Sequence, residues 1–445
     1  MGPIIEKLFH LQESGTNIKR EVIAGVTTFM TLSYIIFVQP AVLGAAGMDP
    51  NAVMAATCIA SAIGTLLMAF LANYPIAIAP AMGHNFYFAF TVCVTLGVSW
   101  QHALGAVFIA GLLFILLSTV GLRETVIAVM PNALRNGIPV GIGLLIALVG
   151  LEWAGIVVSH PATYVTLGKL SSPPVLLSLF GLGVIATLFA LKVRGAILIG
   201  IFASTVVGLF TGLVKFQGIV SAPPSIAPTF LKLQIPNVFV EPHFIAIIFI
   251  FFFLALFDTV GTLIGVSQQG NLMVNGKLPK ARQALLADAI ATGTGALLGT
   301  STVTSYIESA SGISAGGRTG LTNVVTAALL LLALFFNPLI KMVGAGHQVG
   351  ENTFLYPIIA PALIAVGSMM LKNVVQIDWD DMTEAIPAFL TLVMMPFTFS
   401  ITEGISFGFI SYALLKLVSG KGKEVPWLIY LFALLFVARY IWLVG

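Results

Sequence analysis

Two acidic residues and one asparagine are the side chains in this sequence with the clearest potential for chemistry. Asp258 lies inside the apolar run FFFLALFDTVGTLIGV, and Glu308 lies among the small polar residues of TSTVTSYIESASGISAG. Asn85 ends the segment PIAIAPAMGHN, which contains two prolines. An ionised carboxylate only accepts hydrogen bonds, whereas an amide both donates and accepts them. Together the three residues suit an uncharged ligand with N–H groups and ring-nitrogen acceptors.

Neighbouring residues extend this predicted site. His84 precedes Asn85, where it could be a proton carrier or a neutral packed ring, and both interpretations stay open. Asp288 could take part in proton coupling or in a structural network, since a carboxyl group away from water can exchange a proton near neutral pH. Phe86 or Tyr306 could stack on a flat ring. The predicted substrate-binding residues are Asn85, Asp258, Glu308, Gly83, Phe86, Tyr306 and Ser309, and the candidates for proton coupling are Asp258, Glu308, His84 and Asp288.

The composition indicates where these residues must lie. The chain has 445 residues, 58% hydrophobic and 8% charged, whereas soluble domains carry about 25% charged residues. Most of the surface must therefore face lipid, and an acid inside a membrane span, which costs at least about 2.5 kcal/mol, marks a functional site. Cys58 and Cys93 have no metal-ligand spacing, and the sequence has no basic stripe and no phosphate-binding loop. We expect no enzyme activity, metal, cofactor or nucleic-acid partner.

Apolar segments divide the chain into two sets of seven predicted membrane spans. A span needs roughly 20 apolar residues. With the N-terminus in the cytoplasm, fifteen of the 20 Lys and Arg residues fall on the cytoplasmic side and four on the other, as the positive-inside rule expects. The predicted spans are residues 22–43, 51–72, 75–97, 103–121, 132–152, 174–192, 195–215, 244–267, 284–300, 301–318, 321–341, 354–372, 384–400 and 403–419, and residues 425–442 form a fifteenth span or an interfacial helix.

The two sets are predicted to be inverted repeats. The segment ATCIASAIGTLL (56–67) aligns with ADAIATGTGALL (287–298), and an odd number of spans in each set reverses the direction of the second. Transporters built this way hold their substrate near the bilayer midplane, on interrupted helices. The prolines of 75–85 and the polar, β-branched residues of 301–308 break the third and tenth spans. We therefore expect two short extended segments, each followed by a half-helix, to face each other across a pocket.

Six ordered blocks of sequence cover nearly the whole chain and carry a family resemblance. They are NIKREVIAGVTTFMTLSYIIFVQP (17–40), APAMGHN (79–85), GIVSAPPS (218–225), FDTVGTLIGV (257–266), TSYIESASGISAGGRTGLT (304–322) and MMPFTFSITEGISFGFISY (394–412). In these blocks the chain resembles the adenine/guanine/hypoxanthine permease branch of the nucleobase–ascorbate transporter superfamily. The resemblance implies that Asn85, Asp258 and Glu308 correspond to the family's third-span asparagine, eighth-span acid and tenth-span glutamate.

The resemblance also implies an architecture. The fold class expected is an all-α polytopic membrane protein with two inverted seven-helix repeats, in which a core domain moves against a gate domain. The first four spans of each repeat would form the core and the last three the gate. The expected boundaries are 1–121 and 241–345 for the core, 122–240 and 346–420 for the gate, and 421–445 for an extra C-terminal segment.

The function implied is secondary active transport, as proton-coupled uptake of adenine, guanine or hypoxanthine by alternating access. The expected location is the cell inner (plasma) membrane, with a multi-pass chain and a cytoplasmic N-terminus. The expected partners are a purine, protons, the lipid bilayer and, by analogy with related folds, a second copy bound through the gate domain. An anion transporter of the same architecture is the alternative, because half-helix N-termini favour anions. The segment GISAG (312–316) matches the G-x-S-x-G motif of hydrolases, but a small-residue packing face is the preferred interpretation.

Overall fold

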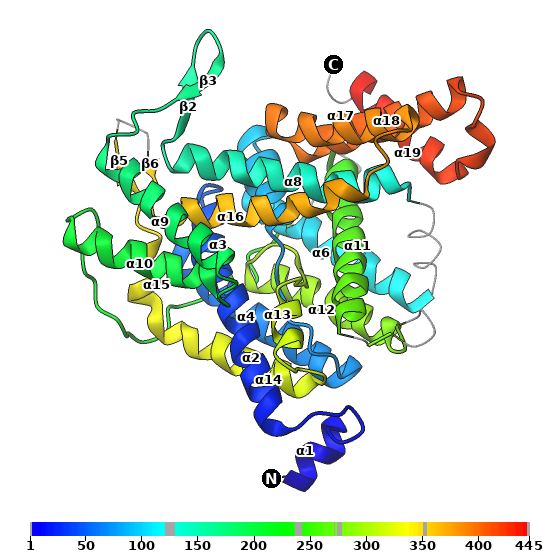
Figure 1. Cartoon of the computed structure of the whole chain (residues 1–445). Helices are drawn as coiled ribbons and strands as arrows, with labels where there is room; N and C mark the ends of the chain where they lie inside the picture. The colour runs from blue at the N-terminus through cyan, green and yellow to red at the C-terminus, as the bar shows by residue number, and fades with distance from the viewer. Residues whose placement is uncertain are drawn as a thin grey trace.

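The computed structural model describes residues 2–120, 130–235, 243–270, 272–273, 278–349 and 354–442, and most of its elements are helices (Figure 1). The helices of the first half are α1 (Gly2–Phe9), α2 (Ile18–Leu32), α3 (Ile35–Gly44), α4 (Pro50–Leu67), α5 (Met82–Phe86), α6 (Trp100–Val120), α8 (Asn132–Trp153), α9 (Pro173–Ala190) and α10 (Ala196–Phe210). Those of the second half are α11 (His243–Gln269), α12 (Ala281–Leu298), α13 (Ser309–Ser314), α14 (Gly320–Leu332), α15 (Asn337–Val343), α16 (Ala360–Met370), α17 (Met382–Thr398), α18 (Ile401–Val418) and α19 (Trp427–Trp442).

Short π-helical and 3₁₀ segments extend several of these helices, and within the described residues six short strands form three pairs. The π-helical segments are Met68–Ala72 after α4 and Tyr87–Thr95 after α5; the 3₁₀ segments are Ala333–Phe336, Leu371–Gln376 and Gly422–Glu424. The strands pair as β1 (Ile78–Pro80) with β4 (Val303–Ser305), β2 (Val157–His160) with β3 (Tyr164–Leu167), and β5 (His347–Gln348) with β6 (Phe354–Leu355).

The helices make this chain a multi-pass membrane protein. Within the described residues, eight helical segments are long and apolar enough to cross a membrane, and three shorter apolar helices accompany them. Each of the fourteen predicted spans contains at least one helix, and residues 425–442 contain α19. The helices begin where the sequence supplies caps: the Asp49 side chain accepts a hydrogen bond from the Ala52 N–H at the start of α4. The orientation of each span across the bilayer remains a prediction.

The two predicted breaks lie against each other. β1 and β4 pair antiparallel, with Ala79 opposite Thr304, and all six residues of the two strands are buried. Pro80 cannot donate a backbone hydrogen bond, and the β-branched Val303 and Thr304 favour extended backbone. Beyond the end of the strand pair, the Ala81 N–H donates to the Thr302 carbonyl oxygen at 3.0 Å. The structure thus confirms that the two predicted breaks, at 75–85 and 301–308, meet as short strands, each followed by a short helix, α5 and α13.

A third interruption, in the first span, had no clear signal in the sequence. α2 ends and α3 begins on either side of Ser33 and Tyr34, where the Ile36 N–H donates to Ser33 O three residues back, at 3.1 Å. Neither Ser33 nor Tyr34 is a helix breaker by type, so propensity alone would continue the helix. The interruption places Tyr34 next to Glu308.

Glycines allow the broken tenth span to approach α2 closely. A Cβ added to Gly312 would lie 2.0 Å from Thr28 Oγ1 and 2.7 Å from Ala24 O. Gly312 opens the GISAG segment, and this contact gives that segment a packing role of the kind found between membrane helices. Gly64 of α4 similarly approaches α12, since its added Cβ would lie 2.9 Å from Ala291 Cβ. α4 and α12 carry the two aligned repeat segments and pack side by side.

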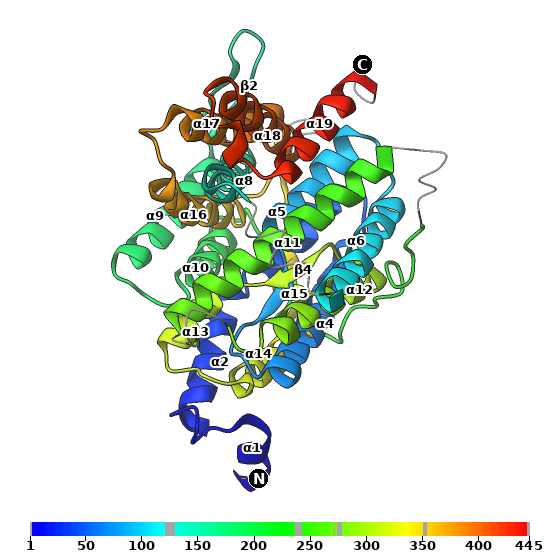
Figure 2. The same cartoon turned by 90° about the vertical axis from the view of Figure 1, so that its right-hand side faces the viewer.

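The helices segregate into two groups. α2, α4, α6, α11, α12 and α14 pack with one another, and α8, α9, α10, α16, α17 and α18 form the second group (Figures 1 and 2). The division of the spans into core and gate domains remains a prediction. The exact domain boundaries remain predictions, and those at 121/122 and 240/241 lie outside the described residues.

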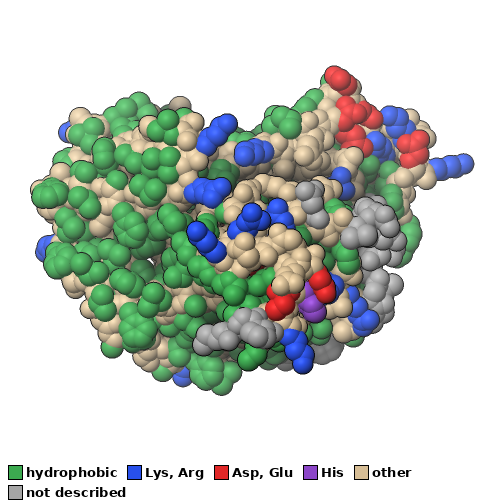
Figure 3. Space-filling model, turned by 60° about the horizontal axis from the view of Figure 1, so that its bottom comes forward, with side chains coloured by type: hydrophobic (Ala, Val, Ile, Leu, Met, Phe, Trp, Pro, Cys, Tyr) green, Lys and Arg blue, Asp and Glu red, His purple; other side chains and the backbone are tan. Residues whose placement is uncertain are grey.

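Lys and Arg side chains gather around the middle of one face of the molecule (Figure 3). The N-terminal helix α1 lies at this end of the structure (Figure 1). Hydrophobic side chains dominate the flank of the same view, as expected for a surface that contacts lipid. A concentration of basic residues at one end is what the positive-inside rule expects of a cytoplasmic face.

Candidate functional site

Asp258 lies in the middle of the long helix α11 and borders open space. Its Oδ2 accepts a hydrogen bond from Thr304 Oγ1 of β4 at 3.1 Å. Its side chain is 45% exposed, although a residue at this position in a spanning helix is far from either end. Gly261 and Gly265 follow on the same helix, and a Cβ added to either would meet nothing within 4 Å. One face of α11 is therefore open from Asp258 toward the end of the helix.

Glu308 lies at the start of α13 and is held by the interrupted first span. The Tyr34 hydroxyl donates to Glu308 Oε1 at 2.6 Å, and Thr31 Oγ1 donates to the Glu308 carbonyl oxygen at 3.3 Å. Tyr34 is 1% exposed, whereas Glu308 is half-buried. Sequence reasoning missed Tyr34, because a tyrosine in an apolar run carries no charge or motif; its hydroxyl in the middle of a span was the only signal.

Asp288 is fully buried and connects three elements. Its Oδ1 accepts from the backbone N–H of Ser305 at 2.6 Å and from Ser305 Oγ at 2.8 Å. Its Oδ2 accepts from Thr259 Oγ1 of α11 at 2.5 Å. Asp288 thus fixes β4 and α11 relative to α12, which is the network role that the sequence left open beside proton coupling.

His84 and Asn85 lie on α5, just behind Asp258. His84 Nδ1 is 3.9 Å from Asp258 Oδ2, so the two form an ion pair when the ring is protonated. Asn85 Oδ1 accepts a hydrogen bond from Ser301 Oγ. Within the described chain, His84 Nε2 and Asn85 Nδ2 are buried and have no hydrogen-bond partner. Asn85 itself has no exposed surface in this structure, unlike Asp258.

The other predicted site residues help to pack the broken spans. Gly83 brings α5 close to α8, since its added Cβ would lie 3.0 Å from Ile142 Cγ2. Phe86 stacks on Phe90 with ring centroids 5.4 Å apart. The roles of Tyr306 and Ser309 are also visible as contacts: the Tyr306 hydroxyl donates to Pro80 O at 2.7 Å, and Ser309 Oγ accepts from the Ala77 N–H at 2.9 Å.

Phe86, Tyr306 and Ser309 are all buried. Of the predicted set, the structure therefore leaves Asp258 and Glu308 at least partly exposed and buries the rest. Substrate contacts by these buried residues remain predictions.

The arrangement can bind an uncharged ligand through hydrogen bonds. Among the residues that the structure describes, no Lys or Arg forms an ion pair with Asp258 or Glu308. Their hydrogen-bond donors are hydroxyl groups, from Thr304 and Tyr34. A carboxylate with only uncharged donors keeps lone pairs for N–H groups of a ligand or for a proton.

Comparison with known proteins places the chain among permeases. The model of the Permease family matches residues 19–407. A chain from Methanocaldococcus jannaschii is 51% identical over 99% of both chains. A guanine/hypoxanthine permease of Bacillus subtilis is 46% identical, with 96% of this chain and 98% of that protein covered. An adenine permease of Escherichia coli is 44% identical, with 99% of this chain and 96% of that protein covered.

Solved structures share the fold at low sequence identity. The transmembrane domain of a cyanobacterial bicarbonate transporter superposes with a TM-score of 0.64 at 16% identity. The superposition covers 88% of this chain and 97% of that one. Identity at this level shows the common fold and carries no information about the substrate.

Proposed function

The chain belongs to the Permease family, in the nucleobase–ascorbate transporter group, and from that premise we propose that it takes up purine nucleobases together with protons. Permeases are transporters, not enzymes. The relatives that share almost the full length of this chain are permeases for adenine and for guanine and hypoxanthine. The proposed substrates are therefore adenine, guanine or hypoxanthine, bound as neutral bases.

The observation that carries the proposal is the position of Asp258 and Glu308 beside the paired strands β1 and β4. Thr304 of β4 donates to Asp258, and Glu308 follows the same strand by three residues. Purines carry N–H groups along their edges, and two carboxylates can accept hydrogen bonds from these groups. Either acid could take up the driving proton, because among the described residues neither has a Lys or Arg partner to hold it ionised.

Alternating access is proposed to use the two helix groups. The core would comprise spans 1–4 and 8–11 and the gate spans 5–7 and 12–14, as two inverted repeats. The antiparallel pair of β1 and β4, and the packing of α4 against α12, are the contacts that a two-fold relation between the repeats would produce. Movement of one group against the other would open the space beside Asp258 to each side in turn.

An anion substrate is less well supported. The solved structures of similar fold include a bicarbonate transporter, and half-helix N-termini favour anions. Two carboxylates at the same place would repel an anion, and the relatives of high identity are purine permeases. We therefore favour an uncharged base as substrate.

The proposal also includes location and assembly. We place the chain in the inner (plasma) membrane with the N-terminus in the cytoplasm, supported by the basic face in Figure 3. A homodimer through the gate domain is proposed by analogy with related folds alone.

Transport by the purified full chain in proteoliposomes tests the function. We expect accumulation of labelled hypoxanthine, guanine or adenine when the outside is more acidic than the inside, and collapse of this accumulation on adding a protonophore. A panel of unlabelled bases then ranks the substrates. Accumulation that needs sodium and persists without a proton gradient would contradict the coupling, and uptake of bicarbonate but of no purine would contradict the substrate.

A further inference from the structure

A series of hydrogen bonds between uncharged side chains links α3 to the residues just before β4 and to α5. Gln39 of α3 is fully buried, and its Nε2 donates to Thr300 Oγ1 at 2.9 Å and to Ser301 Oγ at 3.2 Å. The Ser301 hydroxyl in turn donates to Asn85 Oδ1 of α5. Gln39 lies far from the other residues in sequence and was not singled out as a site residue.

The order of donors and acceptors along these hydrogen bonds determines which atom of the Asn85 amide has no partner. An amide nitrogen has two hydrogens, and Gln39 uses both of them on Thr300 and Ser301. A serine hydroxyl that accepts from Gln39 directs its single proton elsewhere, here to the carbonyl oxygen of Asn85. The amide nitrogen of Asn85 is then left as a buried donor without a partner in the described part of the chain. Buried donors without partners are rare in native proteins, and each calls for an explanation such as a ligand.

We propose that Gln39 is a specificity-determining positioning residue, which acts through Ser301 to make Asn85 a hydrogen-bond donor to the 6-carbonyl oxygen of a purine. The inference rests on the proposed purine transport and narrows its substrate class. Guanine and hypoxanthine carry a carbonyl acceptor at position 6, whereas adenine carries an amino donor there. A donor fixed at Asn85 can bond to the 6-carbonyl oxygen of guanine or hypoxanthine, but it faces the amino donor of adenine. The site therefore favours 6-oxopurines.

The position of α5 is compatible with this contact. His84 precedes Asn85 and has its ring nitrogen 3.9 Å from Asp258 Oδ2, so α5 lies next to the open face of α11. Because Asn85 has no exposed surface in this structure, the contact forms only when a base enters beside Asp258 and displaces the side chains in front of the amide.

Binding measurements on the purified full chain test the inference through a ratio of affinities. We expect the wild-type protein to bind hypoxanthine more tightly than adenine. Ser301→Ala removes the hydroxyl that orients Asn85, so this preference should fall by about tenfold, the effect of one neutral hydrogen bond. Gln39→Met should also reduce the preference for hypoxanthine. The double variant should match Ser301→Ala alone, because both changes act on the same series of hydrogen bonds.

Thr300→Val is the matched control. It removes the other acceptor of Gln39 but leaves Ser301 and Asn85 joined, so the wild-type preference should persist. If folded Ser301→Ala retains the wild-type ratio to within about twofold, the inference is wrong, even though purine transport stands. If the wild-type protein binds neither base, the proposed function itself fails, before any variant is compared.

Discussion

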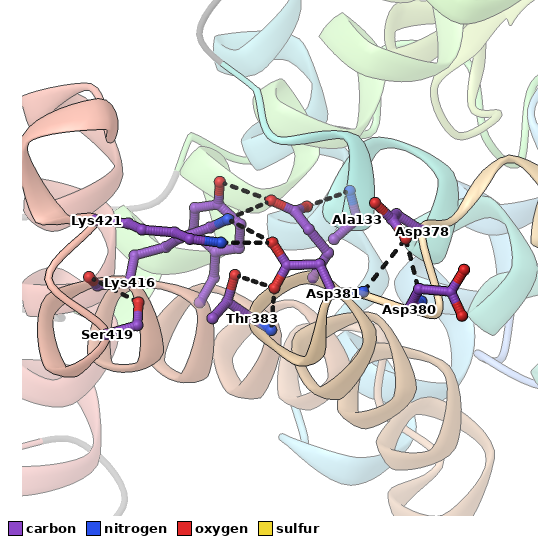
Figure 4. A network of polar contacts seen from close by, with 10 residues as sticks. Ala133, Asp378, Asp380, Asp381, Thr383, Lys416, Ser419 and Lys421 are labelled. Carbon is purple, nitrogen blue, oxygen red and sulfur yellow. Dashed lines mark hydrogen bonds and ion pairs between the residues drawn. The ribbon is translucent and has the colours of Figure 1, made fainter.

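Carboxylates gather in two polar clusters of this molecule, and the clusters differ in how their negative charge is balanced. At the cytoplasmic end predicted for α17 and α18, Asp381 lies next to Lys416 and Lys421 (Figure 4). Glu384 pairs with Lys416 at the same place, and we call these four residues the paired cluster. Lys416 Nζ is 2.8 Å from Glu384 Oε1, and Lys421 Nζ is 3.0 Å from Asp381 Oδ2. Two acids and two bases thus neutralise each other.

Asp258 and Glu308, which we call the unpaired acids, have uncharged donors instead. The hydroxyl groups of Thr304 and Tyr34 donate hydrogen bonds to them. Among the described residues, their only ion-pair partner is the titratable His84, which lies next to Asp258. The paired cluster fixes helices in place: Glu384 also accepts from the Ala133 N–H at the start of α8, at 3.3 Å. In the paired cluster the acids hold helices together through lysine partners, whereas Asp258 and Glu308, whose donors are hydroxyl groups, keep lone pairs for the proposed ligand.

The largest expected effect comes from neutralising the unpaired acids. Glu308→Gln and Asp258→Asn each keep the side-chain shape but remove the charge, and with it the charge-assisted hydrogen bonds and the proton site. We expect purine accumulation to fall by more than about tenfold in each variant, while the protein still folds and inserts. Uptake into proteoliposomes measures the effect, with Glu13→Gln on the exposed N-terminal segment as the control. Wild-type accumulation in both variants would remove the distinction between the clusters.

Breaking the paired cluster should damage stability. Lys416→Met leaves Glu384 without its close basic partner in a mostly buried position. Removing one partner of a buried ion pair typically costs about 3–5 kcal/mol, because the remaining charge is uncompensated. Thermal unfolding of the purified protein should show the loss, and adding Glu384→Gln should recover most of it. A control at the exposed Lys423, Lys423→Met, should have no effect. If the single and double variants are equally stable, the pair has no structural role.

Removing the hydroxyl that holds Glu308 should weaken ligand binding moderately. Tyr34→Phe keeps the buried ring but deletes the 2.6 Å hydrogen bond to Glu308 Oε1. A hydrogen bond to a charged group contributes about 1.5–3 kcal/mol, so purine affinity should fall by roughly tenfold or more. Equilibrium binding measures the change, and Tyr430→Phe, which removes a hydroxyl bonded to Gly422 O instead, should bind normally. Unchanged affinity in Tyr34→Phe would mean that Glu308 needs no positioning by the first span.

The smallest effect is expected for Asp381, whose contribution depends on pH. Hydrogen bonds from Thr383, and then the Lys421 ammonium group, hold the pKa of the Asp381 carboxyl well below its usual range. A lowered folded-state pKa stabilises the protein above the unfolded-state value of about 3.9, and this contribution is lost as the pH falls below it. Asp381→Asn should therefore lower the Tm slightly at pH 7, with the difference from wild type shrinking toward pH 4 and below. A difference that does not depend on pH would contradict this account.

Local sequence features predicted a large part of the fold. The shortage of charges, the length of the apolar segments and the two prolines of 75–85 act on the backbone or its solvent directly, so the membrane class and the third-span break followed from them. The polar residues of 301–308 predicted the second break, and β4 lies within it. The site acids Asp258 and Glu308 were also predictable, because a charged residue in an apolar run is costly wherever the chain folds.

The partners of these acids were not predictable in the same way. Tyr34 is 274 residues from Glu308 in sequence, and Gln39 is 262 residues from Ser301. The first span is interrupted at Ser33 and Tyr34, where the sequence has no proline or glycine that would predict a break. Hydroxyl and amide side chains in apolar segments are also too common in membrane proteins to be assigned a partner by type alone.

By itself, then, this amino-acid sequence determined that the chain spans a membrane many times and that two of its predicted spans are broken, and it predicted that two acids lie inside membrane spans. Composition, proline geometry and the cost of burying charge are local properties. Only the tertiary structure decided that Asp258 borders open space, that Tyr34 holds Glu308, and that Gln39 reaches Asn85 through Ser301. Those outcomes depend on directional hydrogen bonds between distant segments, whose geometry exists only after the helices have packed.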